Sequence, residues 1–554
     1  MNTSFNWKIA GAAGEGIKKA GLIFAKTCFK HGLSVHGYTE YPSLIRGGHN
    51  TFQIHASSAD VVAPGFQLDV LVDIHGQAKD IHKAEITQQT VILADNLPLS
   101  DLVKQAGGSA KMKNMAALGA SCFLLGLSLD KLNQTLAEVF AKKGDEIIQA
   151  NHKVTQAGYN FAQKNFKNQA KPPIKANGEN KDKVFLTGNQ ALSYGAIAGG
   201  MKLYAAYPMT PATSILHTLA AKAKSANITV RHAEDEIGTA NMAIGAGFAG
   251  VRSMVATSGG GFSLMTEALG LAGITETPLV IVNVMRPGPA SGMPTWSSQG
   301  DLLYVIHASQ DEFPRIVLTP GDPQECFQLS KLAQNLAEKY QLPVIILTDK
   351  YLGESYFTIN KPASKHQNQR YGLADTKTLK NDNPFPRYQD TDTGISPRSL
   401  PGQLGGVHLC NSYEHNQLGY ATEDSAERIQ QVNKRAKKIP QILKDPDFIK
   451  PILYGPKTAS QTLISWGSNK SVVLQALKSL KSTNFIHFPL VWPFPAQAFQ
   501  TLIKGSQKLI TLECNSTAQL NQLITQQTGL QIKDKLLKYD GRPFFPEEIV
   551  SKLS

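Results

Sequence analysis

A regular alternation of strand-like and helix-like segments between residues 184 and 352 constrains the fold more than any other feature of the sequence. Short apolar runs such as PLVIVNV (278–284) and PVIILTD (343–349) alternate with stretches of helical character. Strands that alternate with helices in this way form a parallel sheet with helices on both faces. We therefore predict a doubly wound parallel sheet, in which ligands bind beyond the carboxyl ends of the strands.

Composition divides most of the remaining chain into two further α/β blocks and a linker. Residues 1–163 open with a strand-like segment, a glycine turn and a helix-like segment, and further strand candidates follow at Leu68–Ile74 and Thr90–Ala94, so we expect a parallel α/β domain. Residues 164–183 are rich in Lys, Asn, Pro and Gly, which is typical of a linker. Residues 456–554 return to the strand–helix rhythm. The predicted fold class is α/β with several parallel-sheet domains.

Residues 357–455 lack clear periodicity and are rich in Pro, Asn, Asp and Gly. Disorder is one interpretation of such a segment. The aromatic residues Phe385, Tyr388 and Tyr413 argue against disorder, and Ser425–Lys438 is a charged stretch of helical character. We therefore expect an ordered, irregular connecting arm.

Composition also limits the classes of protein to which the chain can belong. Its five cysteines form no CxxC pair, which argues against a disulfide framework, a metal site, or an iron–sulfur cluster held by this chain alone. The formal net charge is +13, but no basic stripe is interleaved with aromatics, so we expect no nucleic-acid binding. The N-terminus shows no signal-peptide pattern, and the most apolar stretch, Ala116–Leu129, is too short to span a membrane. We expect a cytoplasmic protein.

Polar residues follow two strand-like segments of the central block. After KLYAAY comes PMTP (208–211), whose Thr210 could cap the next helix or offer its hydroxyl to a ligand; spacing alone favours the cap. After ITVRHA comes Glu234-Asp235-Glu236, at the start of a helix rich in Gly and Ala. These acids could simply complement the helix dipole, which composition alone favours. A Glu236 carboxyl directed at the close packing surface of that helix would instead be desolvated and have a raised pKa, as an acid–base group requires.

Two further strand-like segments end in residues suited to ligand binding. SMVATS is followed by Gly259–Ser263, where three glycines let the backbone approach a ligand or offer N–H groups to an anion. PLVIVNV is followed by Arg286 in a Pro/Gly-rich loop, and this arginine could bind a carboxylate or pair with a structural acid, two interpretations that stand even. An acid, an arginine, a threonine and a glycine turn on successive strand ends together predict an active site at this edge.

The first block carries weaker signals. Its turn Gly11–Gly16 reads GxxGxG and lacks the GxGxxG fingerprint of dinucleotide-binding domains. The loop Arg46-Gly47-Gly48 could bind an anion such as a phosphate, although a tight turn with an exposed Arg is the simpler interpretation.

At these residues the sequence resembles the 2-oxoacid:ferredoxin oxidoreductase family, in the version whose gamma and alpha parts are fused. The resemblance covers nearly the whole chain and is strongest at YPMTP (207–211), at residues 234–270 and at RPGPASGMPT (286–295). Weaker matches are GAAGEG (11–16) with RGGHN (46–50), DTGISPR (392–398) and DGRPFFPEEI (540–549). Two departures, GGG for the usual GPG and RPGPAS for the usual RGGPST, change backbone stiffness and remove no catalytic side chain.

The resemblance implies a role for each domain. Residues 1–163 would form a gamma-type α/β domain, residues 184–356 a pyrimidine-binding domain of the thiamine-enzyme type, and residues 456–554 a transketolase C-terminal-like domain. The segments 164–183 and 357–455 would then be the linker and the arm between them.

The resemblance also implies roles for individual residues. Glu236 resembles the catalytic glutamate that hydrogen-bonds the aminopyrimidine of thiamine diphosphate and favours its imino tautomer. Arg286 resembles the arginine that binds the substrate carboxylate, and Thr210 and Thr295 resemble hydroxyls that line the substrate site. Further implied contacts are Tyr207, Pro208, Gly259, Gly260 and Phe262 with the cofactor, and Arg46, Gly47 and Gly48 with coenzyme A or another anion.

Features that the chain lacks imply a partner. Thiamine enzymes hold the diphosphate through Mg²⁺ with a GDG…N pattern, and this chain contains no GDG. It also lacks clustered cysteines for a [4Fe–4S] centre. We expect a beta subunit that supplies both, an (αβ)2 assembly with the active site at the subunit interface, and a ferredoxin as the acidic electron acceptor.

The family reaction converts a 2-oxoacid and coenzyme A to acyl-CoA and CO₂ and passes electrons to ferredoxin. Fused chains of this type often resemble the 2-oxoglutarate subgroup, so 2-oxoglutarate is the first substrate to expect, with pyruvate or a broad range of 2-oxoacids as the alternative. Rival interpretations are another class of thiamine enzyme and a non-catalytic scaffold subunit. The joint presence of Glu236, Arg286 and Thr210 argues against a scaffold.

Overall fold

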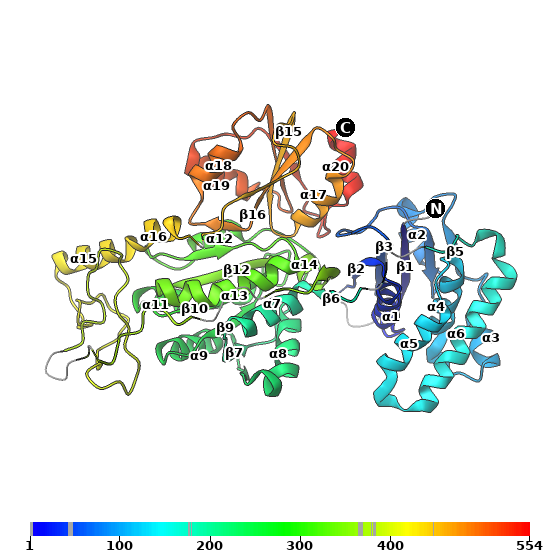
Figure 1. Ribbon diagram of the computed structural model, residues 1–554, viewed down its shortest axis with the longest axis horizontal. Coiled ribbons are helices and arrows are strands. Elements are labelled where there is room, and N and C mark those ends of the chain that lie inside the picture. Colours follow the sequence, from blue (N-terminus) through cyan, green and yellow to red (C-terminus); the bar gives the residue numbers. More distant parts are fainter. Residues whose placement is uncertain are drawn as a thin grey trace.

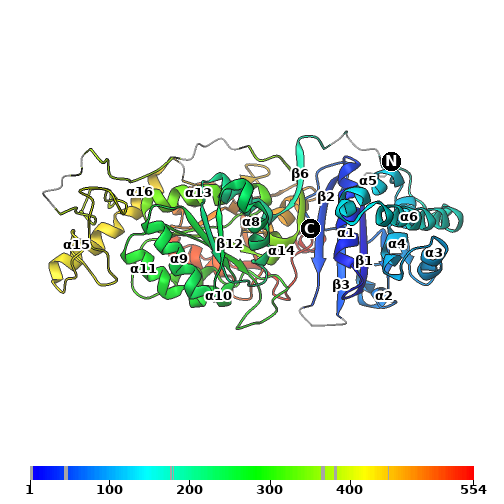
Figure 2. The same cartoon turned by 90° about the horizontal axis from the view of Figure 1, so that it is seen from below.

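The computed structural model contains three α/β domains, each built on one sheet, and an arm (Figure 1). The structure describes residues 4–42, 48–174, 178, 180–363, 369–377, 379, 384–446 and 448–554. Seen from below, the molecule is elongated, and the first domain and the arm lie at its opposite ends (Figure 2). In these described ranges, no helix combines the length and the apolarity that a membrane crossing needs.

The first domain is built on a seven-stranded mixed sheet in the order β5-β4-β1-β3-β2-β13-β6. β1, β4 and β5 are parallel, whereas β3 pairs antiparallel with both β1 and β2. The expectation of parallel pairing throughout this block is therefore wrong, because β3 follows β2 after a short connection, which permits antiparallel pairing. The strand candidates at 68–74 and 90–94 are confirmed as β4 and β5. The strands are β1 (Ser4–Ala12), β2 (Ser34–Glu40), β3 (His49–Ser57), β4 (Val70–Asp73), β5 (Val91–Leu93), β6 (Lys183–Thr187) and β13 (Tyr356–Asn360).

Two strands of this sheet flank the central block in the sequence. β6 was expected to open the central sheet, but it lies at the edge of the first sheet, next to β13. β13 in turn pairs antiparallel with β2. The correction has a physical reason: only the last two residues of β6 are buried, as suits an edge strand, whereas a middle strand of a doubly wound sheet is buried throughout.

Helices α4 and α6 of the first domain pack backbone against backbone. A Cβ atom at Gly119 would lie 1.9 Å from the carbonyl oxygen of Thr155, and one at Gly158 would lie 1.9 Å from that of Ala116. This contact explains why the most apolar stretch of the sequence is rich in small residues: it is a buried helix. The helices are α1 (Ile17–Lys30), α2 (Ala78–Ile81), α3 (Leu99–Gln105), α4 (Lys113–Leu124), α5 (Leu129–Phe140) and α6 (Asp145–Asn165), with short 3-10 turns at Lys83–Glu85, Ala110–Met112, Ala141–Lys143 and Lys167–Gln169.

The central domain has a seven-stranded sheet in the order β17-β11-β12-β10-β9-β7-β8. All pairs are parallel, as predicted, except that β17 from the last block pairs antiparallel with β11. Every residue of β10 and β12 is buried, and α13 and α10 lie on opposite sides of the sheet (Figure 2). The strands are β7 (Leu203–Ala206), β8 (Thr229–His232), β9 (Ser253–Thr257), β10 (Leu279–Met285), β11 (Ile316–Leu318), β12 (Pro343–Asp349) and β17 (Leu490–Trp492). The helices are α7 (Gly188–Ala198), α8 (Thr213–Ala226), α9 (Glu236–Phe248), α10 (Gly259–Leu264), α11 (Thr266–Ile274), α12 (Leu302–His307), α13 (Pro323–Tyr340) and α14 (Lys350–Glu354).

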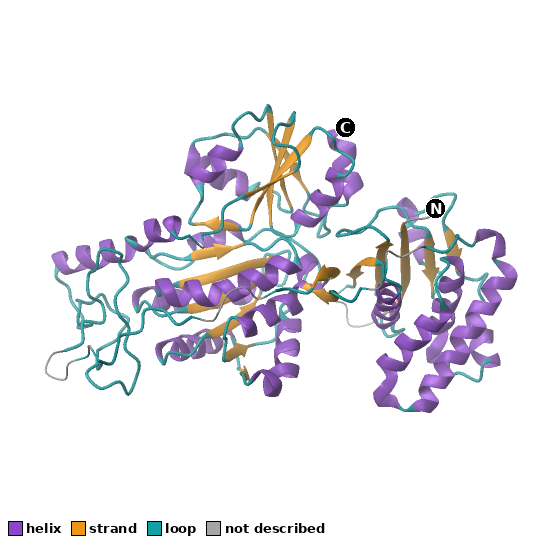
Figure 3. Cartoon of the chain, in the orientation of Figure 1, coloured by secondary structure: helices purple, strands orange, loops and turns teal. Residues whose placement is uncertain are grey.

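The arm is mostly loop and carries the helices α15 (Ser425–Ala436) and α16 (Lys438–Lys444) (Figure 3). Its described part is ordered around buried aromatic residues, because Tyr388 is 1% and Phe385 is 8% exposed. Tyr413 is 72% exposed, so it gives no support to the prediction of order.

Buried charges attach the arm to the central domain. Glu276, at the turn between α11 and β10, is fully buried and forms ion pairs with Lys434 of α15 and Lys438 of α16. Glu338 of α13 pairs with Arg398 of the arm at 3.1 Å, and with Arg252 at 2.8 Å. The described part of the arm is therefore attached to the central domain at both Glu276 and Glu338.

The last domain contains a five-stranded sheet in the order β14-β16-β15-β18-β19. It is parallel, as expected, apart from β14, which pairs antiparallel with β16. The strands are β14 (Ile452–Tyr454), β15 (Gln461–Trp466), β16 (Thr483–Phe488), β18 (Lys508–Glu513) and β19 (Asp534–Leu537), and the helices are α17 (Asn469–Leu477), α18 (Ala496–Leu502), α19 (Gln519–Thr528) and α20 (Pro546–Leu553).

Candidate active site

The four strand ends singled out in the sequence lie next to one another. β8, β7, β9 and β10 are consecutive neighbours in the central sheet and run parallel. Their carboxyl ends therefore meet at one edge, as a doubly wound sheet requires. The segments that begin with Glu234, Tyr207, Gly259 and Arg286 all leave the sheet there.

Glu236 is buried at the start of α9. The neighbouring Asp235 is the N-cap, and its carboxylate accepts a hydrogen bond from the backbone N–H of Gly238 at 2.7 Å. Asp235 is thus the residue that caps the helix, and the side chain of Glu236 is not used for capping. Its side chain is 3% exposed, and its Oε1 has no hydrogen-bond partner in the described structure. Burial raises the pKa of Glu236, with a further contribution from the charge of Asp235.

Glycines are required in the turn that opens α10. A Cβ atom at Gly261 would lie 2.0 Å from Oγ1 of Thr257 and 2.5 Å from Oε1 of Glu236. A Cβ atom at Gly259 would lie 2.6 Å from Oδ2 of Asp301. The glycine turn therefore lets two carboxyl groups approach its backbone.

Arg286 begins the loop of residues 286–297, which we call the Arg286 loop. Its Nη1 donates to the carbonyl oxygen of Thr210 at 2.6 Å, so this bond joins two of the strand ends. In the described part of the chain Arg286 forms no ion pair, which argues against the interpretation as a structural partner of an acid. Its guanidinium is half-buried, burial lowers the pKa of Arg286, and the nearby charge of Asp301 opposes that shift.

Asp301 is a site residue that the sequence did not reveal. It receives a hydrogen bond from Nδ2 of Asn283 at 3.1 Å, and burial raises the pKa of Asp301, although Asn283 and the charge of Arg286 act against that rise. One signal could have pointed to this contact: Asn283 is a fully buried polar residue in the otherwise apolar strand β10. A buried amide needs partners, and Asp301 is one of them.

The other predicted residues fall into different positions. Thr295 is 4% exposed and its Oγ1 has no partner in the described structure. Thr210 does not cap the next helix, because α8 starts at Thr213 with Ala212 as its N-cap. Tyr207 and Pro208 are exposed at the edge. Phe262 is fully buried, with its ring edge-on to that of Tyr304, so it supports the glycine turn from the core.

The loop predicted for coenzyme A or another anion is described only in part. Arg46 and Gly47 lie outside the described residues. The carbonyl oxygen of Gly48 accepts a hydrogen bond from the N–H of Ala13 at 3.2 Å, so this end of the loop lies beside the glycine turn of the first domain.

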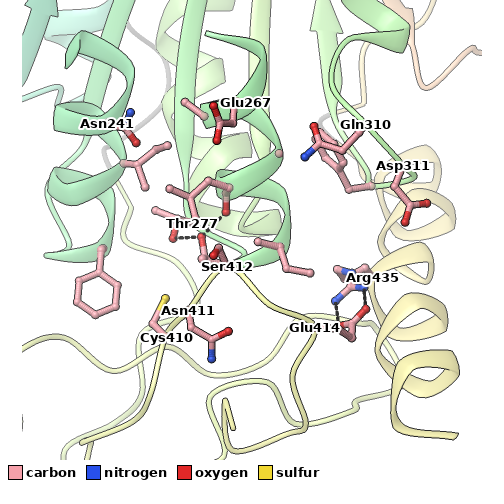
Figure 4. A pocket seen from close by; sticks show the side chains of 18 of the residues that line it. Asn241, Glu267, Thr277, Gln310, Asp311, Cys410, Asn411, Ser412, Glu414 and Arg435 are labelled. Atoms are coloured by element: carbon pink, nitrogen blue, oxygen red, sulfur yellow. Dashed lines mark hydrogen bonds and ion pairs between the residues drawn. The ribbon is translucent and has the colours of Figure 1, made fainter. Parts of the chain in front are cut away.

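A pocket of about 1090 Å³ lies elsewhere, between α9, α11 and the arm (Figure 4). On its arm side, Arg435 holds Glu414 through two hydrogen bonds of 3.0 and 2.8 Å. Ile237 and Leu264 contribute apolar surface to its lining. None of the strand-end residues lines this pocket, so we do not assign the chemistry to it.

Three residues at or after the strand ends carry buried polar atoms that a ligand could satisfy. Oε1 of Glu236, Oγ of Ser258 and Oγ1 of Thr295 are all buried and unpartnered in the described structure. Unpaired buried polar atoms cost free energy unless a ligand satisfies them. A protonatable carboxyl beside a glycine turn is the kind of donor set that an aminopyrimidine ring needs.

Comparison with known proteins decides the family. Residues 194–434 match the family model described as "Pyruvate flavodoxin/ferredoxin oxidoreductase, thiamine diP-bdg", and residues 6–161 match "Pyruvate ferredoxin/flavodoxin oxidoreductase". The alpha subunit of a 2-oxoacid:ferredoxin oxidoreductase from Sulfolobus sp. is 31% identical, over 99% of this chain and 96% of the relative. The chain belongs to the 2-oxoacid:ferredoxin oxidoreductase family.

Other members of the 2-oxoacid:ferredoxin oxidoreductase family support this assignment. The 2-oxoglutarate synthase subunit KorA of Methanothermobacter marburgensis is 32% identical over 67% of this chain and 98% of its own length. The solved structure of the 2-oxoglutarate:ferredoxin oxidoreductase from Magnetococcus marinus, with 2-oxoglutarate, coenzyme A and succinyl-CoA bound, matches with a TM-score of 0.92 and 31% identity, over 100% of this chain and 99% of that one. All the predicted strand-end residues lie within the match to the thiamine-binding model.

Proposed function

We propose that this chain is the fused gamma–alpha subunit that binds the aminopyrimidine of thiamine diphosphate and the carboxylate of a 2-oxoacid. The reaction is the oxidative decarboxylation of that acid with coenzyme A to acyl-CoA and CO₂, with electrons passed to a ferredoxin. The observation that carries the proposal is the buried carboxyl of Glu236, whose Oε1 has no partner among the described residues, at the same sheet edge as Arg286.

The proposed role of Glu236 follows from its environment. Thiamine diphosphate, when bound, supplies the carbanion chemistry of the reaction. A carboxyl with a raised pKa keeps its proton to a higher pH than an exposed glutamate does, and it can share that proton with a ring nitrogen. Glu236 is suited to this task because Oε1 makes no competing hydrogen bond in the described structure.

Arg286 is proposed to hold the 2-oxoacid. One arm of its guanidinium is fixed by the carbonyl oxygen of Thr210, which sets the orientation of the remaining donors. A guanidinium offers parallel hydrogen bonds that match a carboxylate. Thr210 and Thr295 are proposed to line the same site, and Asp301 to keep the charge of the site balanced before the substrate binds. The residues Tyr207, Pro208, Gly259, Gly260 and Phe262 would shape the cofactor side.

The site is proposed to be completed by a beta subunit. Two large apolar side chains at this edge are exposed in this chain, Tyr207 by 39% and Met293 by 40%. Exposed apolar side chains that cluster on a surface are typical of protein interfaces. We propose that the beta subunit brings the Mg²⁺–diphosphate site and a [4Fe–4S] cluster, and that the complex is a cytoplasmic (αβ)2 assembly that reduces a ferredoxin.

We propose 2-oxoglutarate as the preferred substrate. The names of KorA and of the structurally similar enzyme from Magnetococcus marinus both point to this acid. Pyruvate or a broad range of 2-oxoacids is the alternative. Coenzyme A is proposed to approach from the first domain, where Gly48 lies near the glycine turn.

Reconstitution tests the proposal. The chain is produced with and without the cluster-carrying beta subunit, and coenzyme-A-dependent viologen reduction is followed anaerobically with thiamine diphosphate and Mg²⁺. We expect turnover only when both chains are present, and fastest with 2-oxoglutarate among 2-oxoglutarate, pyruvate and branched or aryl 2-oxoacids. A stable, cofactor-loaded complex that turns over none of these acids would refute the proposal.

A further inference from the structure

The motif DGRPFFPEEI (540–549) belongs to the last domain but contacts the Arg286 loop. The carbonyl oxygen of Gly541 accepts a hydrogen bond from the backbone N–H of Ser297 at 2.8 Å. Gly541 has a positive φ of 86°, which favours glycine, and a Cβ there would lie 3.1 Å from Cβ of Trp296 and 3.2 Å from Cε of Met293. The backbone of the motif is thus in close contact with the C-terminal end of the Arg286 loop.

Arg542 extends this contact to the first domain. Its guanidinium carbon lies 4.3 Å from the ring centre of Trp296, which is the geometry of a cation–π contact. Its Nε lies 3.6 Å from Oε1 of Glu40, the last residue of β2. The hydroxyl of Tyr38 donates to the same carboxylate oxygen at 3.2 Å, so Glu40 is held in place by its own strand.

The second half of the motif reaches the first domain directly. The carboxylate of Glu547 accepts a hydrogen bond from the N–H of Phe66 at 3.2 Å. The rings of Phe66 and Phe545 meet edge to face, with centres 5.4 Å apart. The motif therefore touches the Arg286 loop at one end and the first domain at both ends.

We propose that Arg542 is a positioning residue that sets the conformation of the Arg286 loop by linking Trp296 to Glu40. The proposal rests on the proposed function, in which this loop receives the 2-oxoacid. The loop leaves the central sheet at Arg286 and runs to Ser297, so the hydrogen bond to Gly541 and the stack on Trp296 fix its far end. The position of the first domain then affects the substrate site through Arg542.

Kinetics of the reconstituted complex test the proposal with Arg542→Ala. Loss of the link leaves the loop end less fixed, so we expect the KM for 2-oxoglutarate to rise about tenfold with kcat within about twofold, because the loop acts on substrate binding. The conservative Arg542→Lys keeps the positive charge and should bring the KM to within about threefold of wild type. Glu40→Gln, which weakens the link from the other domain, should raise the KM in the same direction.

Arg428→Ala is the matched control. Arg428 is 50% exposed and pairs with Asp311 at 2.8 Å and with Glu414 at 2.9 Å. The control variant therefore removes a similar surface arginine that is far from the Arg286 loop in the sequence. We expect this variant to keep the wild-type KM. An Arg542→Ala complex whose KM equals that of the control would overturn the proposal.

Hydrogen exchange separates this proposal from the proposed function. In the complex, the amide of Ser297 should exchange at least about fivefold faster in Arg542→Ala than in wild type, since faster local opening speeds exchange. If no 2-oxoacid is turned over by the wild-type complex, the proposed function fails, and this exchange rate still decides the role of Arg542. Equal exchange in wild type and variant means that Arg542 does not fix the loop.

Discussion

At the scale of single residues, the buried carboxyl of Glu236, the half-buried carboxyl of Asp301 and a glycine turn determine the shape of the candidate site. Glu236 packs against Gly261, and Asp301 packs against Gly259. The site therefore depends on glycine at these two positions as much as on the two carboxyl groups. A substitution in the turn should act on the carboxyl groups first.

Gly261→Ala is predicted to displace Glu236. The added methyl group would lie 2.5 Å from Oε1 of Glu236 and 2.0 Å from Oγ1 of Thr257, so both side chains must move away from it. We expect a loss of about 1–3 kcal/mol in stability from overpacking, and about a hundredfold loss of activity from the misplaced carboxyl. Thermal unfolding and viologen reduction by the reconstituted complex measure the two effects.

Gly245→Ala in α9 is the control for this substitution. Its Cβ would have no atom within 4 Å, so the extra methyl group meets open space. Ala in place of Gly within a helix should leave stability unchanged or raise it by about 1 kcal/mol. Equal losses in both variants would show that the contact between Gly261 and Glu236 does not matter.

The sequence predicted the site unevenly at this scale. A buried Glu236 with a raised pKa was one of two interpretations of its Gly- and Ala-rich helix, and composition alone favoured the other, but the structure shows both the burial and the raised pKa. Asn283 in an apolar strand signals that a polar partner is needed, but the sequence does not identify Asp301 as that partner, because only the folded sheet brings Asp301 next to Asn283 and Gly259. The predicted contacts of these residues with thiamine diphosphate, the 2-oxoacid and coenzyme A stay predictions.

At the scale of elements, ion pairs between buried side chains attach the arm to the central domain. Glu276 is fully buried, and it faces the ammonium groups of Lys434 and Lys438, which are 0% and 1% exposed. Burial lowers the pKa of Lys438 to about 8, although Glu276 acts in the opposite direction. This cluster stabilises the attachment of the arm only while Glu276 is present, because two buried ammonium groups cannot both remain charged without a neighbouring carboxylate.

Glu276→Gln is predicted to loosen the arm. Removing the charge leaves Lys434 and Lys438 buried and unpaired, which should cost about 3–5 kcal/mol. We expect a lower Tm and faster proteolysis within residues 384–446. Arg428→Ala instead removes an arginine that is 50% exposed, with its ion pairs to Asp311 and Glu414, and should cost about 0–1 kcal/mol. A Glu276→Gln protein as stable and protease-resistant as that control would contradict the account.

The arm and its charged helical stretch were predictable from composition, whereas its attachment was not. The prediction of Ser425–Lys438 as helical is confirmed by α15, which is followed directly by α16. Glu276 lies in a turn with a φ of 49°, and nothing in the local sequence shows that it faces a segment more than a hundred residues away. Long-range ion pairs of this kind leave no local pattern.

At the scale of the whole molecule, the three sheets share chain segments and charges. β6 and β13 complete the first sheet from both sides of the central block, and β17 of the last block joins the central sheet. The domain boundaries implied by the family resemblance do not account for these three strands, because strands exchanged between domains have no signature in a single sequence. The domains therefore should not behave as independent units.

A buried ion cluster between the central and last domains should make stability depend on pH. Glu325 of α13 pairs with Lys470 at 2.6 Å and with Nε2 of His487 at 2.9 Å. Burial alone would raise the pKa of Glu325, but His487 and Lys470 hold it well below its usual range. Because the folded pKa is depressed, this stabilisation is present above the unfolded value of about 4.3 and is lost as the pH falls below it.

Glu325→Gln is predicted to remove this pH dependence. The Tm gap between wild type and variant should be largest near neutral pH and should shrink as the pH falls below about 4.3. Differential scanning calorimetry over that range measures the gap. A gap that stays constant with pH would mean that the carboxylate does not contribute through its ionisation.

Glu236→Gln provides the most direct test of the central claim, which is that this chain supplies the carboxyl for the thiamine ring. In the complex with the beta subunit, we predict that Glu236→Gln lowers kcat for coenzyme-A-dependent oxidation of 2-oxoglutarate by about 10²–10⁴-fold, while Glu234→Gln, an exposed acid two residues away, keeps wild-type activity. The fold should be retained, because the amide is similar in size to the carboxyl. Wild-type activity in a correctly assembled Glu236→Gln complex would contradict the account.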